Sequence, residues 1–133
     1  MRSTASSPLL LHNTMRIRPG HLEQYKAAVR RAVEFVEEHG SQIMVQVFID
    51  EERLEAHSFQ LYPDSDAILA HWKLSDPYIQ DVMQHCTVER LEMFGEPDER
   101  VRSAMSPVDT SDVPRQTFPR LIGFLRPTTT AAR

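Results

Sequence analysis

The chain has 133 residues, of which 41% are hydrophobic and 26% charged, and its formal net charge is -4. This composition is typical of one folded domain, and the negative charge gives no electrostatic basis for binding nucleic acid or an anionic membrane. No apolar run reaches the roughly 18 residues of a membrane span, so no transmembrane helix is expected. The first residues lack a signal-peptide core, and the lone Cys86 excludes an intramolecular disulfide, which favours the cytoplasm.

The N-terminal part predicts a leader, a strand and a helix. Residues 1–8 are small, polar and proline-terminated, which indicates a disordered leader. Residues 9–18 alternate between two faces, a period of two that is typical of a strand. Apolar residues then recur every three or four positions between 22 and 36, which predicts an amphipathic helix. Gly40 is expected to end this helix in the left-handed conformation.

The middle of the chain predicts a hairpin, two short helices and a further strand. Residues 42–50 are rich in β-branched and aromatic side chains and predict a strand. Residues 54–62 predict another strand, and a polar turn joins the two into a hairpin. A short helix is predicted over 67–73. A second helix is predicted to begin at Pro77, because proline is tolerated in the first turn of a helix. Residues 87–94 predict the next strand.

After Pro97 the composition changes, which divides the chain into a domain over residues 9–97 and a C-terminal extension over 98–133. The extension begins with one or two helical turns and continues as a proline-rich surface loop over 106–119. An apolar stretch follows. It predicts either an extra strand at 120–126 or a segment that docks on a partner.

The order of these elements is that of a split βαβ arrangement, an α+β fold of the ferredoxin-like type with an antiparallel four-stranded sheet and helices on one face. The strand at 42–50 carries Val45 and Val47 on one side and Met44 and Phe48 on the other. The helices can cover only one face of the sheet, and a large exposed apolar face is rare in a monomer. Two protomers packed sheet against sheet would cover the other face, so a homodimer is expected.

Three segments resemble the antibiotic biosynthesis monooxygenase family of dimeric α/β barrels. Their sequences are LLHNTMRIRPG from Leu10, AHWKLSDPY from Ala70 and ERLEMFG from Glu89. The resemblance covers about residues 9–97 and implies the dimeric α/β-barrel fold. The family includes cofactor-free monooxygenases that act on quinols and polycyclic phenols, haem-degrading enzymes, sugar-phosphate isomerases and members with no known activity.

Asn13 and Trp72 are the first candidate catalytic residues. Asn13 shares a strand face with apolar residues such as Leu11 and Met15. A buried amide without partners costs roughly 1–3 kcal/mol, so it bonds either to nearby backbone and water or to a ligand. Trp72 either anchors its helix on the sheet or offers its indole N–H and ring to a planar substrate. In the resembled family, a first-strand asparagine is frequent and a tryptophan at this place lines the pocket.

His71 is the third catalytic candidate, because a histidine pKa near 6.5 suits proton abstraction from a phenol at neutral pH. It lies about 100° from Trp72 around the helix, so the two are not expected to face one cavity equally. An exposed or capping histidine is the alternative. Three further residues are predicted to bind substrate: His57, which would also assist proton transfer, and Tyr78 and Phe48, which would shape an apolar wall.

Metal and cofactor chemistry find little support in the sequence. His57 and Glu55 lie two residues apart in a strand, but His12 or His85 would have to complete a metal site, so no metal is expected. Haem-degrading relatives bind iron through a histidine about ten residues after the tryptophan, where this chain has Val82. No glycine-rich loop for a nicotinamide or flavin is present, so no cofactor is expected.

The leading hypothesis is therefore a cofactor-independent monooxygenase that oxidises a small quinol or polycyclic phenol with molecular oxygen. Its small aromatic substrate would deprotonate to an electron-rich anion. Asn13 and Trp72 would then stabilise this anion through oriented donors, with His71 or His57 assisting proton transfer.

Two other functions stay open. A non-catalytic module of the same fold would bind a small ligand in the pocket or a partner through the extension at 98–133. Isomerase chemistry on a phosphorylated sugar would need cationic pocket residues, for which Arg16 and Arg90 are the candidates.

Overall fold

The computed structural model describes residues 8–104 and 113–126. Most of the predicted leader at 1–8, and residues 106–112 of the predicted surface loop, lie outside the described residues. Within the described ranges, no helix is long and apolar enough to cross a membrane.

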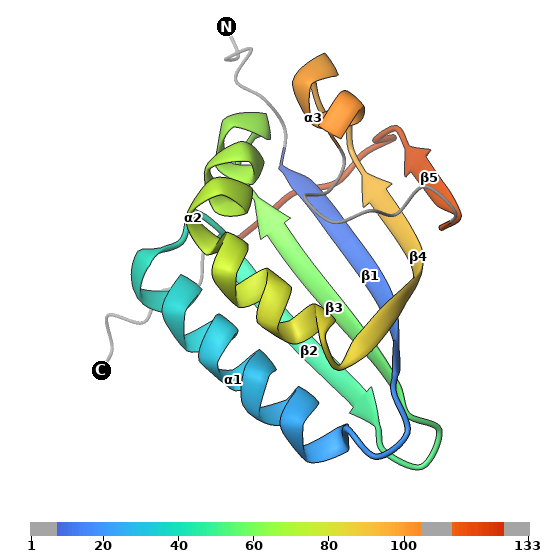
Figure 1. The fold of residues 1–133 in the computed structure, drawn as a ribbon. Coiled ribbons are helices and arrows are strands. Elements are labelled where there is room, and N and C mark those ends of the chain that lie inside the picture. Colours follow the sequence, from blue (N-terminus) through green and yellow to red (C-terminus); the bar gives the residue numbers. More distant parts are fainter. Residues whose placement is uncertain (1–7, 105–112, 127–133) are drawn as a thin grey trace, which may run out of the picture.

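The described residues form five strands and three helices. In chain order they are β1 (Leu9–Ile17), α1 (Leu22–His39), β2 (Met44–Asp50), β3 (Glu55–Tyr62), α2 (Ser65–Met83), β4 (Cys86–Phe94), α3 (Glu99–Ala104) and β5 (Arg115–Phe118). The strands make one sheet in the order β2-β3-β1-β4-β5, in which β5 pairs parallel with β4 and the other pairs are antiparallel. Helices α1 and α2 lie side by side over one face of the sheet (Figure 1). The predicted ferredoxin-like α+β fold is confirmed, with a fifth strand added at one edge.

The helix-facing side of the sheet holds two separate apolar clusters. The first joins the start of β1 to α2 and α3 through Leu9, Leu11, Tyr62, Ala67, Ile68, Met93 and Val101. The second joins the end of β1 to α1 through Met15, Ile17, Tyr25, Ala56 and Cys86. Asn13 lies between Leu11 and Met15 on the same side of β1 and belongs to neither cluster. The hydrophobic core is therefore interrupted at the one amide of this strand face.

Helix α2 differs from the prediction of two short helices. It is continuous from Ser65 to Met83, with Pro77 inside it. A proline inside a helix removes one backbone hydrogen bond and costs about 3 kcal/mol. The buried stripe formed by Ile68, His71 and Ser75 continues up to the proline, so packing of this stripe outweighs the lost bond.

The end of α1 also differs from its prediction. Gly40 ends the helix with φ -85° and ψ 175°, which is extended rather than left-handed. A Cβ atom here would lie 2.6 Å from Gln42 Oε1 and 2.7 Å from the Val36 carbonyl oxygen. Glycine is needed at this position because the chain passes close to these atoms.

The extra strand of the extension lies at Arg115–Phe118 and not at 120–126. The parallel pairing sets Phe118 beside Phe94, and their stacked rings have centroids 5.0 Å apart. Apolar character alone pointed to residues 120–126, but Leu121 and Ile122 are 94% and 85% exposed. Backbone pairing with β4 and this ring contact decide where the strand forms.

The side of the sheet that the helices leave uncovered is called the open face here. Phe48 on β2 is 57% exposed on it and meets Phe59 edge-on, with ring centroids 6.0 Å apart. The His12 ring on β1 stacks on the Phe59 ring, with the two centroids 4.2 Å apart. The predicted homodimer would cover this face, and that association stays a prediction.

Candidate functional site

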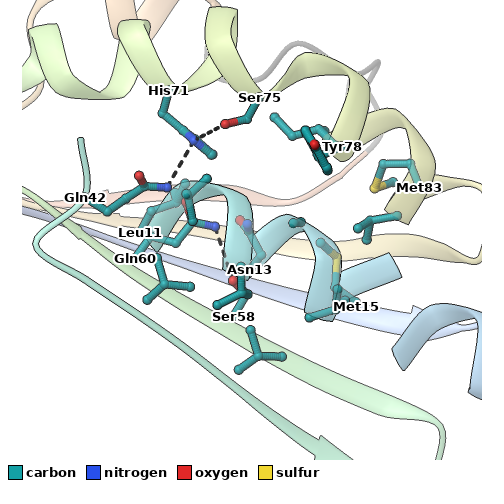
Figure 2. Close-up of a pocket in the computed structure, with 18 of the residues that line it drawn as sticks. Leu11, Asn13, Met15, Gln42, Ser58, Gln60, His71, Ser75, Tyr78 and Met83 are labelled. Carbon is teal, nitrogen blue, oxygen red and sulfur yellow. Dashed lines mark hydrogen bonds between the residues drawn. The ribbon is translucent and has the colours of Figure 1, made fainter. Parts of the chain in front are cut away.

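A cavity of about 140 Å³ lies between the helices α1 and α2 and the helix-facing side of the sheet (Figure 2). Its wall is mainly aliphatic and aromatic, and none of the described residues that line it is an aspartate, glutamate, lysine or arginine. Amide, hydroxyl and imidazole groups are supplied by Asn13, Gln42, Ser58, Gln60, His71 and Ser75. Such a lining suits an uncharged, largely apolar molecule that carries a few hydrogen-bonding groups.

Asn13 reaches this cavity from the centre of the sheet. Its partners across the two neighbouring strands are Ser58 on β3 and Leu91 on β4, and all three line the cavity. The Oδ1 atom of Asn13 is buried and has no hydrogen-bond partner among the described residues. An unpaired buried acceptor costs roughly 1–3 kcal/mol, so this oxygen is a place where a ligand donor would be favourable.

His71 enters the cavity from α2 and is only 7% exposed. Its Nδ1 atom lies 3.0 Å from Ser75 Oγ and 3.1 Å from Gln42 Nε2 (Figure 2). Burial lowers the pKa of His71 from 6.5 to about 4, because the charged imidazolium loses its hydration. The ring is therefore neutral at pH 7.

Polar side chains of β3 continue this arrangement. Gln60 Nε2 donates to Ser58 Oγ over 3.2 Å, and the Tyr62 hydroxyl donates to Gln60 Oε1. Burial raises the pKa of Tyr62, an effect that a hydrogen bond from the Gln42 side chain opposes. The phenol is thus protonated at neutral pH, and its hydroxyl donates to Gln60 and accepts from Gln42.

Four of the six predicted site residues line this cavity: Asn13, His71, Trp72 and Tyr78. His71 and Trp72 both border it although they are adjacent on the helix. Trp72 also packs on the first apolar cluster, and Tyr78 stacks on Phe35 with ring centroids 4.4 Å apart.

The structure does not bring His57 and Phe48 to the cavity. They are partners in the β2–β3 pairing and lie on the open face, while their neighbours Ser58 and Val47 line the cavity. Successive residues of a strand point to opposite sides, so the sheet separates these two from the other four. The prediction that they contact the same substrate is therefore not met.

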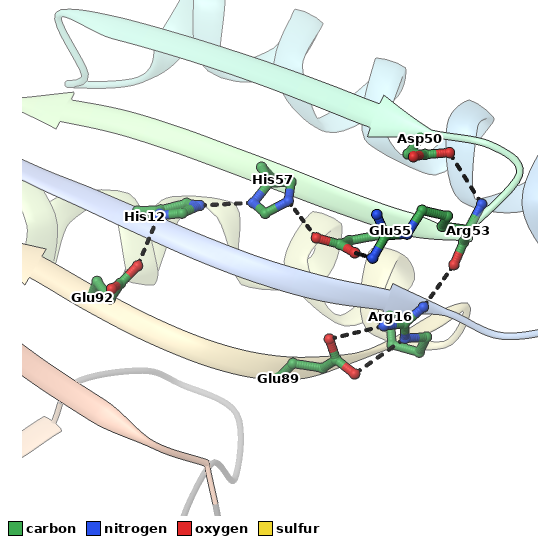
Figure 3. A network of polar contacts seen from close by, with 8 residues as sticks. All are labelled: His12, Arg16, Asp50, Arg53, Glu55, His57, Glu89 and Glu92. Atoms are coloured by element: carbon green, nitrogen blue, oxygen red, sulfur yellow. Dashed lines mark hydrogen bonds and ion pairs between the residues drawn. The ribbon is translucent and has the colours of Figure 1, made fainter.

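His57 instead belongs to a line of ionisable groups across the open face (Figure 3). Its Nε2 lies 2.7 Å from Glu55, its Nδ1 lies 2.9 Å from His12 Nε2, and His12 Nδ1 lies 2.9 Å from Glu92. These groups form a row and do not converge on one point. In the described part of the chain, no three metal-ligating side chains are grouped to hold an ion.

Sequence reasoning missed the polar residues that surround His71 and Asn13. Ser58 and Gln60 lie on one side of β3 and His57 lies on the other. The sequence predicts this alternation, but it does not show which of the two sides faces the helices. Ser75 lies four residues after His71, a spacing that puts both on one side of a helix. That spacing was the available signal.

The comparisons with known proteins find matches in structure but none in sequence. No protein-family model and no curated protein sequence gives a significant match. Solved structures do match. MupZ from Pseudomonas fluorescens has a TM-score of 0.72 and 18% identity, with 93% of this chain and 98% of that chain covered.

Two further structural matches cover about two thirds of this chain. SnoaB from Streptomyces nogalater, a cofactor-independent oxygenase, has a TM-score of 0.57 and 13% identity over 70% of this chain and 96% of its own. A proposed antibiotic biosynthesis monooxygenase from Bacteroides thetaiotaomicron has a TM-score of 0.54 and 18% identity over 65% and 85%. At these identities the likeness concerns the fold. The chain has the fold of structures from the antibiotic biosynthesis monooxygenase family, as its sequence resemblance implied.

Proposed function

We propose that the protein is a cofactor-independent monooxygenase that oxidises a small quinol or phenol in the cavity between helices and sheet. The observation that carries this proposal is the buried, unpaired Oδ1 of Asn13 in a mainly apolar cavity. A phenol carries a hydrogen-bond donor on a planar apolar ring. Its hydroxyl would pair with the unpaired oxygen of Asn13, and its ring would fill the apolar part of the cavity. The fold likeness to SnoaB supports the same reaction class without identifying a substrate.

The reaction requires a substrate that becomes electron-rich where it can meet molecular oxygen. A substrate hydroxyl that donates to Asn13 Oδ1 is held with its O–H bond polarised, and it ionises by losing its proton to solvent, because an amide oxygen is not a base. A carbon of the resulting anion forms a bond to one atom of molecular oxygen. The peroxide so formed loses water, so one oxygen atom stays in the product and the other leaves as water. The indole N–H of Trp72 and the imidazole of His71 are the lining groups that can stabilise charge on a second substrate oxygen. The apolar wall excludes water, which strengthens these interactions.

The dimensions of the cavity favour a single aromatic ring as the bound part. An apolar cavity of about 150 Å³ is known to hold benzene, and this one measures about 140 Å³. A second hollow of about 520 Å³ between α1 and β2 shares Tyr25, Val29, Val33, Val45 and Val47 with it. A polycyclic phenol would place its further rings there.

A homodimer is part of this proposal. The open face carries exposed Phe48 and the partly buried Phe59 and His12, and a second copy packed face to face would cover them. The cavity lies on the opposite side of the sheet, so association through the open face leaves it accessible.

The test is oxygen consumption by the purified protein with a panel of one-ring quinols and anthrone-like phenols, without added cofactor. Asn13→Ala is expected to reduce the rate at least 30-fold, roughly the 2 kcal/mol of one hydrogen bond to an ionising group. Glu37→Gln, on the exposed side of α1, is the matched control and should retain full activity. Equal rates for the two variants would contradict the role of Asn13.

A non-catalytic binding module is the second candidate, favoured by the exposed apolar segment after β5, where Leu121, Ile122 and Phe124 are 79–94% exposed. A quinol that binds to the wild-type protein and is recovered unchanged under oxygen would favour this reading. Sugar-phosphate isomerisation has less support, because Arg16 and Arg90 do not line the cavity.

A further inference from the structure

The hydrogen bonds around His71 determine which ring nitrogen carries its proton. Nδ1 lies 3.1 Å from the amide nitrogen of Gln42 and 3.0 Å from the hydroxyl of Ser75. An amide nitrogen only donates, whereas a hydroxyl can donate or accept. Both contacts are hydrogen bonds only if Nδ1 is an unprotonated acceptor and Ser75 donates to it.

The orientation of the Gln42 amide follows from the residues on β3. The single hydroxyl proton of Tyr62 is donated to Gln60 Oε1, which leaves the Tyr62 oxygen as an acceptor. The Gln42 side chain bonds to this phenol in the sense that lowers its pKa, as a donor does. An amide NH₂ group has two hydrogens, so Gln42 can donate one to Tyr62 and one to His71.

The groups that face His71 leave it neutral. Gln42 precedes β2 and Ser75 lies on α2, and neither ionises. Tyr62 on β3, with its ring centroid 5.9 Å from that of His71, keeps its proton at neutral pH because burial raises the pKa of its phenol. A neutral imidazole carries one proton. Since Nδ1 is the acceptor of two hydrogen bonds, that proton is on Nε2, which has no hydrogen-bond partner in the described part of the chain.

We propose that His71 acts in the cavity as a hydrogen-bond donor through Nε2–H, and not as a general base, with Gln42 and Ser75 as positioning residues that hold this tautomer. The cavity then offers two buried unpaired acceptors, Asn13 Oδ1 and Gln42 Oε1, and one donor, His71 Nε2–H. These groups select a neutral aromatic molecule that has both a hydroxyl and an oxygen acceptor, such as a phenol that carries a ketone group or an enolised ketone. The substrate class rests on the proposed function, whereas the tautomer does not.

A histidine in a pocket can act as a general base or as a hydrogen-bond donor, and the two roles require different protonation of the ring nitrogen that faces the substrate. A general base needs a free ring nitrogen on the substrate side, which the Nε2–H tautomer does not have. A donor can be replaced by another donor. His71→Gln, which retains an N–H, is therefore expected to keep turnover within about threefold of wild type, while His71→Phe loses about 100-fold, the typical effect of removing one donor to a developing oxyanion.

The direct experiment is long-range ¹H–¹⁵N NMR of the uniformly labelled full chain between pH 5.5 and 8, with the His71 signals identified by their loss in His71→Gln. The expected spectrum has the proton on Nε2 throughout this range. Gln42→Glu, which replaces the amide donor by a carboxylate acceptor, should move a proton to Nδ1 and raise the pKa of His71. Ser75→Ala, which keeps Gln42, should retain the Nε2–H form.

A wild-type spectrum with the proton on Nδ1, or an imidazolium at pH 7, would overturn the proposal without any variant having to fold. The NMR result and the oxygen-uptake result test the tautomer and the proposed function separately. Absence of oxygen uptake together with an Nε2–H signal would count against the monooxygenase and leave the donor assignment supported. Uptake that depends on pH through His71 and is lost in His71→Gln would count against the donor assignment alone.

Discussion

Asn13 on β1 lies directly opposite Ser58 on β3, and both side chains line the cavity that separates the two apolar clusters of the core. A strand face that is otherwise apolar thus carries a polar pair where a continuous core would be expected. The Oδ1 atom of Asn13 remains unpaired, so the protein loses folding stability at the position where a ligand would gain a hydrogen bond.

Replacing this amide by an apolar side chain should therefore stabilise the protein and abolish its function. Asn13→Leu removes an unpaired buried acceptor and extends apolar surface between Leu11 and Met15, so the free energy of unfolding should rise by about 1–3 kcal/mol. Urea denaturation with unchanged m-value measures this, and oxygen uptake should fall to background. A variant that is less stable than wild type would show that Asn13 has a structural partner.

The buried His71 should make stability depend on pH. Its folded pKa of about 4 lies below the unfolded value of 6.5, so the unfolded chain binds the proton more tightly. Stability is then highest above pH 6.5 and falls as pH decreases from 6.5 towards 4, by roughly 3 kcal/mol in total. The measurement is the difference in unfolding free energy between wild type and His71→Gln at pH 7.5 and 4.5. A difference that does not change with pH would contradict the burial of a neutral ring.

Gly95 is expected to tolerate no side chain. Its φ is +119°, and a Cβ atom would lie 2.7 Å from Leu9 Cδ2 in the first apolar cluster. Gly95→Ala should lower the unfolding free energy by roughly 1–3 kcal/mol through backbone strain alone, and more through the contact. Gly123→Ala is the control, since its nearest neighbour is the flexible end of Arg120 at 3.3 Å, and it should change stability by less than about 0.5 kcal/mol.

The homodimer prediction is tested on the open face. Phe48→Asp puts a charge where a second copy would pack, so it should shift sedimentation at micromolar concentration from dimer to the 15.3 kDa monomer. Leu74→Asp is the matched control, because Leu74 is 45% exposed on α2, which covers the other side of the sheet. A wild-type protein that sediments as a monomer would rule out the dimer, and so would a dimer that survives Phe48→Asp unchanged.

The order of the elements and most of their positions could be predicted from periodicity, since strands and helices bury side chains at different spacings. Periodicity could not predict the contacts between segments that lie far apart in the sequence. Pro77 lies inside α2 because His71 and Ser75 are buried before it and Val82 and Met83 pack on the second apolar cluster after it. Strand β5 forms at Arg115–Phe118 because β4 offers a free edge there. Neither fact is visible in the local sequence.

The candidate site was predictable to a similar degree. Asn13, His71, Trp72 and Tyr78 stand out because a polar or aromatic group interrupts an otherwise regular face, and the structure places them around one cavity. The sequence of β3 has hydrophobic and polar residues on both sides, so nothing in it reveals that Ser58, and not His57, faces the helices.

Whether this cavity oxygenates a substrate can be decided by ¹⁸O incorporation from labelled oxygen gas. The product of a one-ring quinol or anthrone-like phenol is analysed in cofactor-free buffer for wild type, Asn13→Leu and Glu37→Gln. We expect one labelled oxygen atom per product molecule for wild type and Glu37→Gln, and none above background for Asn13→Leu. An unlabelled product, or labelling that survives Asn13→Leu, would contradict a monooxygenase built on this cavity.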